Sequence, residues 1–464
     1  MRTGRTVISL LIGLVLLVIG CRQRVQLTPR SYYVAVTGDD SNPGTMEAPF
    51  RSPGYGAAQM HSGDTLVILS GRYVLDSYED IIIPPSGDSE LWTVVRGEGP
   101  TRPVLAGRED LICAISLSGR QCVEVSGLEI TSDSGALFRQ GIDLTPAPAS
   151  FVLLSDLHIH HLDEFGINAG DVQWLEISHS KITHCGFGAI GGPAGYRGGW
   201  CNVLIYGCTL SYSGHYYQGG PGPSPYSRPD GFGIEASDGP VEIANTVVEH
   251  NRGDGIDSKA KNTWVHECVI ANNSCDGVKF WAAAKLENSL IYGRGDGDTT
   301  TTPWAAIVID AGRAGQSFSI TNVTVDDSLG KNYLLYVQYD NNLKTYLNLT
   351  NNILSGRGPN SPIYLGSRVQ PVFRHNLFYL PRNQIVLQHG SRLYPSDSLH
   401  LLGPGNIYGD PRFLATGFGT TGNYHLDVAS PAIDAGTGDS VPEIDLEGRN
   451  RPIGSGYDIG CYEQ

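Results

Sequence analysis

The chain has 464 residues, of which 59 are glycine and only 17% are charged, and its formal net charge is −15 at pH 7. This length suffices for one elongated solenoid or for two to three compact domains, and the glycine content suits a turn-rich β protein. The negative charge argues against a nucleic-acid partner, because phosphate groups bind to basic surfaces. An acidic surface is compatible with a protein that binds cations.

The N-terminus predicts export. Arg2 and Arg5 precede an apolar run over residues 7–19, as in the positive and apolar regions of a secretory signal. Residues 18–21, VIGC, resemble a bacterial lipobox, which implies that Cys21 is lipidated and becomes the first residue of the mature protein. The alternatives are an ordinary signal peptide or an anchor helix, although the run is short for a membrane-spanning helix.

The domain organisation follows from this leader and from the later sequence. We predict a lipoprotein signal peptide at 1–21 and a short tether at 22–31. An exported lipoprotein of the bacterial outer membrane or cell surface would be attached to the membrane through Cys21. No second apolar run in the sequence is long enough to span a membrane.

Short strands are predicted from Ser31 onward. The segment from Ser62 to Val74, SGDTLVILSGRYV, is an apolar strand that is entered and left through glycine turns, and Val94 to Gly107 continues in the same manner. Alternating apolar and polar residues separated by Gly, Asp, Asn and Pro indicate β structure throughout this region.

A ladder of similar segments lies between Asp156 and Trp281. Aligned on glycine, its register is Gly166, Gly188, Gly233, Gly255 and Gly277. The spacings are 22, 45, 22 and 22, and we interpret the 45 as two steps with one extra residue. A repeat of 20–30 residues, each with a short strand and a turn, is typical of a β-solenoid.

A solenoid places residues one repeat apart on adjacent rungs, about 4.8 Å from each other. The residue two positions after each glycine then forms one column, which reads Asn168, Ile190, Glu235, Asp257 and Lys279. We expect the last three side chains to point outward on successive rungs. The structural alternative is an exposed ladder of charges in which Lys279 only pairs with Asp257, a contact of little energetic value.

The same spacing predicts stacks of small polar residues. Thr246, Cys268 and Ser289 occupy equivalent strand positions, so we expect a small-residue stack inside the coil, with cysteine acting as a small hydrophobe. Asn251 and Asn273 are 22 residues apart and predict a stacked asparagine turn of structural role. Eight cysteines follow Cys21; export permits disulfides, but their pairing cannot be read from spacing.

One insertion, Ser211 to Pro229, interrupts the ladder and is rich in tyrosine, glycine and proline. Loops on rigid scaffolds often carry binding residues. Tyr216 and Tyr217 could stack on sugar rings, and Arg228, together with Arg252 nearby, could pair with substrate carboxylates. The alternative is a glycine- and proline-rich loop without a binding role.

The ends of the mature chain resemble those of secreted bacterial right-handed parallel β-helix proteins. The similar segments are YYVAVTGDDSNPGTMEAPF and GDTLVILSGRY near the start, and SPAIDAG and DIGCYE near the end. The resemblance implies an all-β fold, a single right-handed parallel β-helix of the pectate lyase-like type. We expect the helix with its N-terminal cap over 32–400 and a C-terminal cap or tail over 401–464.

Within this fold, residues 230–279 resemble the active site of family 9 polysaccharide lyases. The matches are Asp-Gly-Phe at 230–232, Gly-Asp-Gly-Ile-Asp at 253–257 and Gly-Val-Lys at 277–279. The resemblance implies a calcium ion held by Asp230, Asp254 and Asp257, with Lys279 as the catalytic base.

The match departs from the family at Gly253, which stands where the family often has a further aspartate. Glu235 or water is therefore expected to replace that ligand. A cluster of carboxylates suits calcium, which takes six to eight oxygen ligands. Such a cation stabilises the enolate that forms when a base removes the proton next to a sugar carboxylate, and a nearby cation lowers the pKa of a lysine.

The leading functional hypothesis is a surface lipoprotein, expected to be a monomer, that cleaves an acidic, uronate-containing polysaccharide by calcium-dependent β-elimination. One alternative is a glycoside hydrolase similar to polygalacturonases, although their Gly-His-Gly and Arg-Ile-Lys motifs do not occur in this sequence. Another is a non-catalytic carbohydrate-binding or adhesive protein. Fold alone does not separate these functions, because the solenoid hosts all of them.

Overall fold

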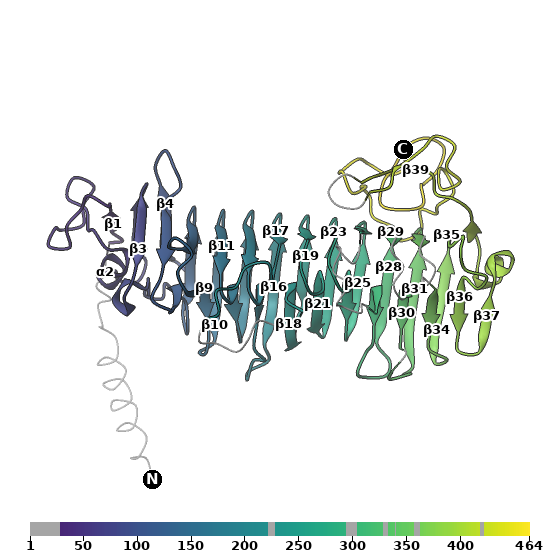
Figure 1. Ribbon diagram of the computed structural model, residues 1–464, viewed down its shortest axis with the longest axis horizontal. Coiled ribbons are helices and arrows are strands. Elements are labelled where there is room, and N and C mark those ends of the chain that lie inside the picture. The colour runs from purple at the N-terminus through teal and green to yellow at the C-terminus, as the bar shows by residue number, and fades with distance from the viewer. Residues whose placement is uncertain are drawn as a thin grey trace, which may run out of the picture.

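The computed structural model describes residues 28–220, 228–293, 304–327, 333–338, 340–356, 362–417 and 422–464. Over these residues the chain winds into a right-handed parallel β-helix whose coils stack along the long axis of the molecule (Figure 1). The predicted fold class is confirmed. Three long sheets, named A, B and C here, run the length of the helix.

Sheet A begins each coil, and its described strands are, in spatial order, β1 (Ser31–Val34), β2 (Thr65–Leu69), β4 (Thr93–Glu98), β7 (Gln121–Ser126), β10 (Ala149–Ser155), β13 (Val172–Ser178), β16 (Trp200–Tyr206), β19 (Val241–Ala244), β22 (Asn262–His266), β25 (Ala283–Glu287), β28 (Ser317–Thr321), β31 (Thr345–Thr350) and β34 (Val369–Arg374).

Sheet B follows sheet A in each coil, and its described strands are β3 (Arg72–Leu75), β5 (Val104–Gly107), β8 (Glu129–Ser132), β11 (His158–Leu162), β14 (Lys181–Cys185), β17 (Thr209–Ser211), β20 (Val247–Glu249), β23 (Val269–Ala271), β26 (Leu290–Tyr292), β29 (Thr324–Asp327), β32 (Ile353–Gly356), β35 (Leu377–Tyr379) and β38 (Ile407–Tyr408).

Sheet C completes each coil, and its described strands are β6 (Leu111–Ser116), β9 (Phe138–Leu144), β12 (Phe165–Ala169), β15 (Gly188–Gly192), β18 (Asp230–Ser237), β21 (Ile256–Ala260), β24 (Val278–Phe280), β27 (Ala305–Ile309), β30 (Tyr333–Val337), β33 (Ile363–Leu365), β36 (Leu387–His389) and the antiparallel β37 (Arg392–Tyr394).

The ends of the helix are covered by short elements. Helix α2 (Pro53–Ala58) lies at the N-terminal end, beside β1, and the hairpin of β36 and β37 with the 3₁₀ helix η2 (Ser396–Leu402) lies at the other end (Figure 1). A further 3₁₀ helix, η1 (Tyr78–Asp80), follows β3. Among the described residues, none of these helices has the length and apolar character needed to cross a membrane.

The C-terminal tail does not close the end of the helix. It carries the small hairpin of β39 (Phe413–Ala415) and β40 (Asn423–Leu426) and folds back along the outside of sheet B (Figure 1). Thr324 on β29 accepts a hydrogen bond from the backbone of Cys461 at 3.0 Å, and buried Arg451 donates one to Asn288 at 3.0 Å. The tail therefore covers one side of the solenoid, and the hairpin of β36 and β37 lies at its end.

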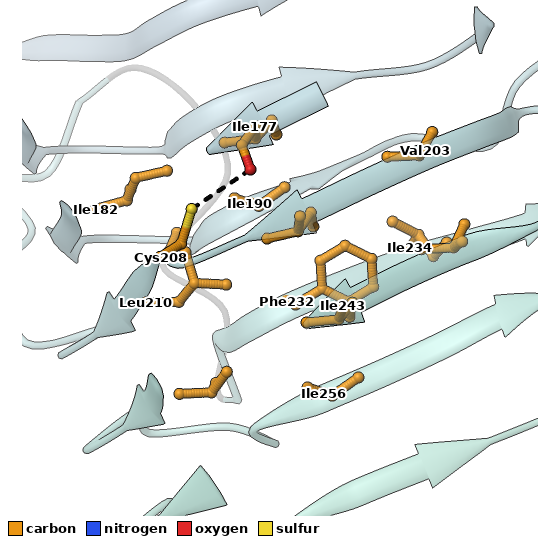
Figure 2. Packing of buried hydrophobic residues seen from close by; sticks show 14 of the residues in the cluster. Ile177, Ile182, Ile190, Val203, Cys208, Leu210, Phe232, Ile234, Ile243 and Ile256 are labelled. Carbon is orange, nitrogen blue, oxygen red and sulfur yellow. Dashed lines mark hydrogen bonds between the residues drawn. The ribbon is translucent and has the colours of Figure 1, made fainter. Parts of the chain in front are cut away.

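The core is a set of apolar columns inside the coils. One column, seen in Figure 2, contains Ile190, Phe232 and Ile256 and continues through Val278 to Ile307, each paired with the next in register. All five side chains are at most 1% exposed. Each buried residue of this size contributes roughly 1.5–3 kcal/mol to folding, so the register of the coils is fixed by this interior.

The predicted small-residue stack is confirmed at the corner between sheets A and B. The Thr246 hydroxyl accepts a hydrogen bond from the Cys208 backbone at 3.3 Å, and the Ser289 hydroxyl accepts one from the Cys268 backbone at 3.1 Å. Cys208 itself lies inside the coil, with its thiol facing Ile177 (Figure 2). All eight cysteines of the described residues are free, so the stack rests on small size rather than on disulfides.

The predicted asparagine stack is also confirmed. The Asn273 carboxamide oxygen accepts hydrogen bonds from the backbone and the side chain of Asn251, at 3.1 and 2.9 Å. A second stack of this kind links Asn352, Asn376 and Asn406 near the C-terminal end. Buried amides in these corners satisfy backbone groups of the neighbouring coil, which would otherwise lack partners.

The ladder register differs from the prediction at two coils. Strand β15 pairs Phe165 with Gly188 and Asn168 with Gly191, so the outward column contains Gly191 rather than the buried Ile190.

The second difference lies in β18. Strand β18 pairs Phe232 with Ile256 and Gly233 with Asp257, so Gly231, rather than Gly233, corresponds to Gly255. The physical reason is the interior column, because Phe232 is the residue of this segment that fills the apolar core.

The step between Gly188 and Gly233 is one coil, not the two inferred from the spacing of 45. Strand β15 pairs directly with β18, and long connections before and after β16 and β17 account for the extra residues. The outward column adjoining the candidate site therefore reads Asn168, Gly191, Gly233, Asp257 and Lys279.

The signal segment and Cys21 lie outside the described residues, as does most of the tether, and Ser31 already belongs to β1. Lipidation and export therefore stay predictions.

The asparagine stack gives a stability test far from the candidate site. Asn376→Ala would leave the buried backbone N–H of Asn352 without its acceptor, so we expect a loss of about 2–4 kcal/mol in unfolding free energy, measured by urea denaturation. The control is exposed Asn262, whose replacement by alanine should change stability by less than about 0.5 kcal/mol. Equal effects would show that the stack does not stabilise the corner.

Candidate active site

Three aspartates stack at one corner of the solenoid, where the chain enters sheet C. Asp230, Asp254 and Asp276 each precede a glycine, and each carboxylate accepts a backbone N–H from the next coil. The distances are 2.7 Å from Asp254 N to Asp230 Oδ1 and 2.9 Å from Asp276 N to Asp254 Oδ1. Asp276 Oδ1 continues the ladder by accepting the backbone N–H groups of Trp304 and Ala305.

Glycine follows each aspartate because the coils approach closely there. A Cβ atom on Gly255 would lie 2.6 Å from the carbonyl oxygen of Gly277, and one on Gly277 would lie 2.5 Å from that of Ala306. The recurring Asp-Gly pair is thus a steric requirement of the corner as well as a source of carboxylates.

Lys279 is buried against this ladder. It is the register partner of Asp257 on the adjacent rung, as the sequence predicted, but its ammonium pairs with Asp254 at 2.6 Å and with Asp276 at 2.9 Å. The Lys279 side chain also lies over the Trp304 ring, 4.9 Å from its centroid. A simple surface pair between Lys279 and Asp257 is therefore not the arrangement found.

Three carboxylates converge beside Lys279. Ligand oxygens of Asp230, Asp254 and Asp257 all lie within 4.8 Å of one another, so the structure brings together the three aspartates predicted to bind calcium. Asp257 Oδ1 also accepts a hydrogen bond from the Trp281 indole at 2.6 Å. Three acidic groups at this separation repel one another unless protons or a cation compensate their charge.

The pKa values of the cluster reflect burial. Burial and the charge of Asp276 raise the pKa of Asp254 to about 7, and burial with the charge of Asp254 raises that of Asp230. Burial also raises the pKa of Asp257. Although burial opposes it, the carboxylates around Lys279 raise the pKa of its ammonium well above the ordinary value, so the lysine is protonated in the ion-free cluster.

Two glycines shape the space around Asp230. A Cβ on Gly233 would lie 2.8 Å from Asp230 Oδ2, and one on Gly253 would lie 2.4 Å from Asp230 Oδ1 and 2.6 Å from the Arg228 carbonyl. At Gly253, where the sequence departs from the lyase pattern that it resembles, this backbone leaves no room for a side chain. Glycine is thus required there by the close approach of Asp230 to this turn.

The cluster opens into a small pocket of about 110 Å³. Asp230, Asp257, Arg228 and the rings of Phe165 and Phe187 line it. A larger neighbouring groove of about 630 Å³ shares Lys259 with the pocket and is lined further by Lys261, Trp281 and Arg313. Basic and aromatic side chains therefore adjoin the acidic cluster on the same side of the solenoid.

The expected position of Glu235 is wrong. It does not stack on Asp257; Gly233 takes that place, and Glu235 lies in a β-bulge between Ile234 and Ser237. Its carboxylate pairs with the Lys259 ammonium at 2.6 Å and is not among the three convergent ligands. The bulge adds one residue to β18, which places Glu235 at the rim of the pocket.

Of the four predicted substrate-binding residues, only Arg228 lines the pocket. The Arg252 side chain packs beside Gly214 and is not part of the pocket lining. The Tyr217 ring stacks on Phe187, 6.1 Å between centroids, directly behind the pocket wall. Tyr216 contacts His161 and Ser132 on the sheet B side, away from the aspartates.

Sequence reasoning did not predict that Asp276 pairs with Lys279 or that the Trp281 indole donates a hydrogen bond to Asp257. A signal existed for Asp276: the pair Asp-Gly recurs at 230, 254 and 276, with spacings of 24 and 22. Aligning on this pair rather than on glycine alone gives the register of the structure. No comparable signal marked Trp281, because its indole reaches Asp257 across one coil.

No protein-family model matches the chain, and no curated protein sequence matches it. Solved structures do resemble it. The XylC structure, a complex with xylose, has a TM-score of 0.63 at 10% identity, covering 93% of this chain and 98% of that one. The fold is thereby supported as a parallel β-helix.

Two further structures align at lower TM-scores. Pectate lyase Pel9A aligns with a TM-score of 0.49 at 15% identity over 94% of this chain and 97% of that one. The A-module of the mannuronan C-5 epimerase AlgE4 from Azotobacter vinelandii also has a TM-score of 0.49, at 13% identity over 75% and 89%. These likenesses do not single out family 9 of the polysaccharide lyases.

The raised pKa of Asp254 predicts a pH-dependent stability. The folded chain keeps this proton up to pH about 7, whereas the unfolded chain loses it near pH 3.8. Between these values the folded state binds more protons, so the unfolding free energy should fall as pH rises. The unfolding free energy should fall by up to roughly 4 kcal/mol over this pH range, at about 1.4 kcal/mol per pKa unit.

Urea denaturation between pH 4 and 7, in a chelating buffer that removes divalent cations, measures this effect. Asp254→Asn removes the titrating group and should flatten the dependence relative to the unmodified chain. Parallel curves for the two proteins would contradict the assignment of this proton to Asp254.

Proposed function

We propose that the protein is a carbohydrate-active enzyme that cleaves a uronate-containing polysaccharide by β-elimination, with calcium bound by Asp230, Asp254 and Asp257. The observation that carries this proposal is the convergence of these three carboxylates beside one buried lysine, on the face of sheet C. The resemblance to family 9 polysaccharide lyases supports the same assignment of residues.

The acidic cluster fits a hard divalent cation. Calcium prefers oxygen ligands and accepts both one and two oxygens from a carboxylate. Counting Asp276 and Lys279 with the three ligands, the ionised cluster has a net charge of −3. Burial raises the pKa values of Asp230, Asp254 and Asp257, and neighbouring carboxylates raise those of Asp230 and Asp254 further, so a bound cation would favour their ionised forms. The ion, when bound, would polarise the substrate carboxylate and so make the neighbouring C–H proton more acidic.

Lys279 is assigned as the base, although its ammonium is buried against Asp254 and Asp276, is protonated there and is not part of the pocket lining. It shares Asp254 with the proposed ion, so its pKa falls when that carboxylate is also paired with the ion and a second positive charge lies nearby. In the neutral form, the amine can accept the proton from the sugar carbon next to the carboxylate. The contact of the Lys279 side chain with the Trp304 ring and its pairing with Asp276 hold this side chain in place during the transfer.

The neighbouring groove suits an acidic chain of sugars. Lys259 and Lys261 line it but are paired with Glu235 and Asp238, while Arg313 adds positive charge and the Trp281 ring an apolar surface. A substrate carboxylate would compete with these two acidic side chains for the lysines, whose positive charge lessens the repulsion that a protein of charge −15 exerts on an anionic polymer. Arg228 lines the pocket, and we assign it to pairing with a substrate carboxylate.

A glycoside hydrolase is the second candidate, and one observation favours it. Asp254, with its pKa raised to about 7, retains a proton near neutral pH, and Asp257 has a carboxylate oxygen within 4.8 Å. Two neighbouring carboxyl groups, one of which retains its proton, are the components of glycosidic hydrolysis. Hydrolysis releases saturated sugars, whereas β-elimination creates a C=C bond that absorbs in the ultraviolet.

The first functional test is a screen of polyuronates such as pectate and alginate with calcium. We expect ultraviolet-absorbing product that EDTA abolishes and calcium restores. Asp257→Asn should remove calcium binding in calorimetry together with turnover. New reducing ends without ultraviolet absorbance would favour the hydrolase, and saturable binding without cleavage would favour a non-catalytic binding protein.

The second test concerns Lys279. Lys279→Arg keeps the positive charge beside Asp254 and Asp276 but cannot act as a neutral base, so turnover should fall by roughly 10²–10⁴-fold. Folding, followed by circular dichroism, and substrate binding, followed by calorimetry, should change little. An arginine variant with near-normal turnover would show that Lys279 serves only to neutralise the aspartates. Lys261→Arg, in the adjacent groove, is the matched control and should remain active.

A further inference from the structure

A second group of metal-ligating side chains lies on the outer face of sheet B. His158 and His160 alternate on β11 and therefore point to the same side of the strand. Glu129 on the neighbouring β8 is the register partner of His158. One ligand atom from each of these three residues lies within 4.8 Å of the others, an arrangement that the sequence analysis did not single out. The acidic cluster described above is on sheet C, so the two groups are separate.

The spacing of these side chains is close to that of a metal centre. His160 Nε2 lies 3.4 Å from Glu129 Oε1, and His158 Nδ1 lies 3.9 Å from Glu129 Oε2. In a tetrahedral zinc site with bonds of 2.0–2.1 Å, neighbouring ligand atoms are about 3.3 Å apart. Small side-chain rotations would therefore bring all three ligands to bonding distance of one ion.

The His160 ring is oriented by contacts on its far side. Its Nδ1 atom lies 3.2 Å from the Thr131 hydroxyl and 2.7 Å from His161 Nδ1, which leaves Nε2 directed at Glu129. Partners of this kind fix the tautomer and direction of histidines that bind metals.

His161 is itself held by neighbouring rings. It stacks on His184 at 4.9 Å and meets Tyr216 edge-on at 5.0 Å. The insertion loop that carries Tyr216 thus supports the histidine cluster.

The donor set selects the class of ion. Two imidazoles and one carboxylate suit zinc and related transition metals, whereas calcium prefers oxygen ligands throughout. Burial lowers the pKa of both imidazoles, which favours their neutral, metal-binding form. The side chains keep between 17% and 33% of their surface exposed, so an ion can enter and a fourth position stays open to water.

Two positive side chains lie near the cluster. Lys181 is the register partner of His158 on the other side, and Arg102 is paired with Asp156 at 2.5 Å. Their charges oppose a cation, so the affinity depends on direct coordination rather than on a favourable field.

We propose that Glu129, His158 and His160 bind one zinc ion, or a related divalent transition metal, on the outer face of sheet B. The ion would link β8 to β11 and so clamp two successive coils. This site is independent of the proposed calcium centre, and neither proposal depends on the other.

Calorimetric titration with zinc chloride of the protein without its predicted signal peptide, residues 1–21, tests the proposal. The protein is purified without a polyhistidine tag and freed of metal with EDTA. We expect one saturable site and a roughly 100-fold or greater loss of affinity in His160→Ala and in Glu129→Gln. Cobalt should bind at the same site and show the visible absorption of a tetrahedral ion.

Two variants serve as controls. His425, which pairs with Glu447 at 3.1 Å without a second histidine ligand, should tolerate replacement by alanine with zinc binding unchanged. Asp257→Asn, which alters the acidic cluster, should also leave zinc binding intact.

Three results would overturn the proposal: no saturable zinc binding at 100-fold molar excess, unchanged affinity in Glu129→Gln, or loss of zinc binding in Asp257→Asn. If His160→Ala fails to fold, as judged by circular dichroism, Glu129→Gln alone decides, because its amide keeps the size of the side chain.

Discussion

Backbone pairing between successive coils is the constraint on which the rest of this protein depends. Parallel strands hydrogen-bond in register along three sheets, so each side chain lies about 4.8 Å from its counterpart on the next rung. A residue type that recurs once per coil therefore stacks on residues of the same type in the neighbouring coils. Inside, this produces apolar columns; at the corners it produces stacks of asparagine, threonine, serine and cysteine.

The same constraint explains the electrostatics of the acidic cluster. Stacking Asp230, Asp254 and Asp276 forces like charges together, which is unfavourable unless each carboxylate is compensated. The backbone N–H groups of the next coil compensate one oxygen of each, and Lys279 compensates two of the three aspartates. Asp230 and Asp257 remain with less compensation, and they face the pocket.

The two outer faces present different ligands. Sheet C offers carboxylates, which suit a hard cation, whereas sheet B offers imidazoles with one carboxylate, which suit a softer one. The C-terminal tail covers another part of sheet B, where its side chains pack with Ala271, Leu290 and Tyr292. The solenoid thus separates two sets of ligand atoms by the side of the coil from which each residue projects.

The sequence by itself predicted a β-solenoid from its repeat, because a constant coil length places equivalent residues on neighbouring rungs, and Asp257 and Lys279 are register partners as their spacing of 22 predicts. The parallel β-helix type and the grouping of Asp230, Asp254 and Asp257 came from the resemblance to known families, because the repeat aligned on glycine misplaced the coil of Asp230. The small-residue and asparagine stacks were predictable from the repeat. The histidine cluster was not singled out, although His158 and His160 alternate along one strand, because Glu129 reaches them only through the register of β8 with β11.

Only the tertiary structure decided the register of the middle coil and the partners of Lys279. The segment DGFGIEAS offers two glycines for alignment, and the apolar interior chose between them by burying Phe232. That choice moved Glu235 into a bulge and placed Gly233 beneath Asp257. The Lys279 ammonium pairs with Asp254 and Asp276 rather than with Asp257, because its long side chain extends to the neighbouring column of residues. The repeat predicts which residues share a column, but it does not predict the direction of a flexible side chain.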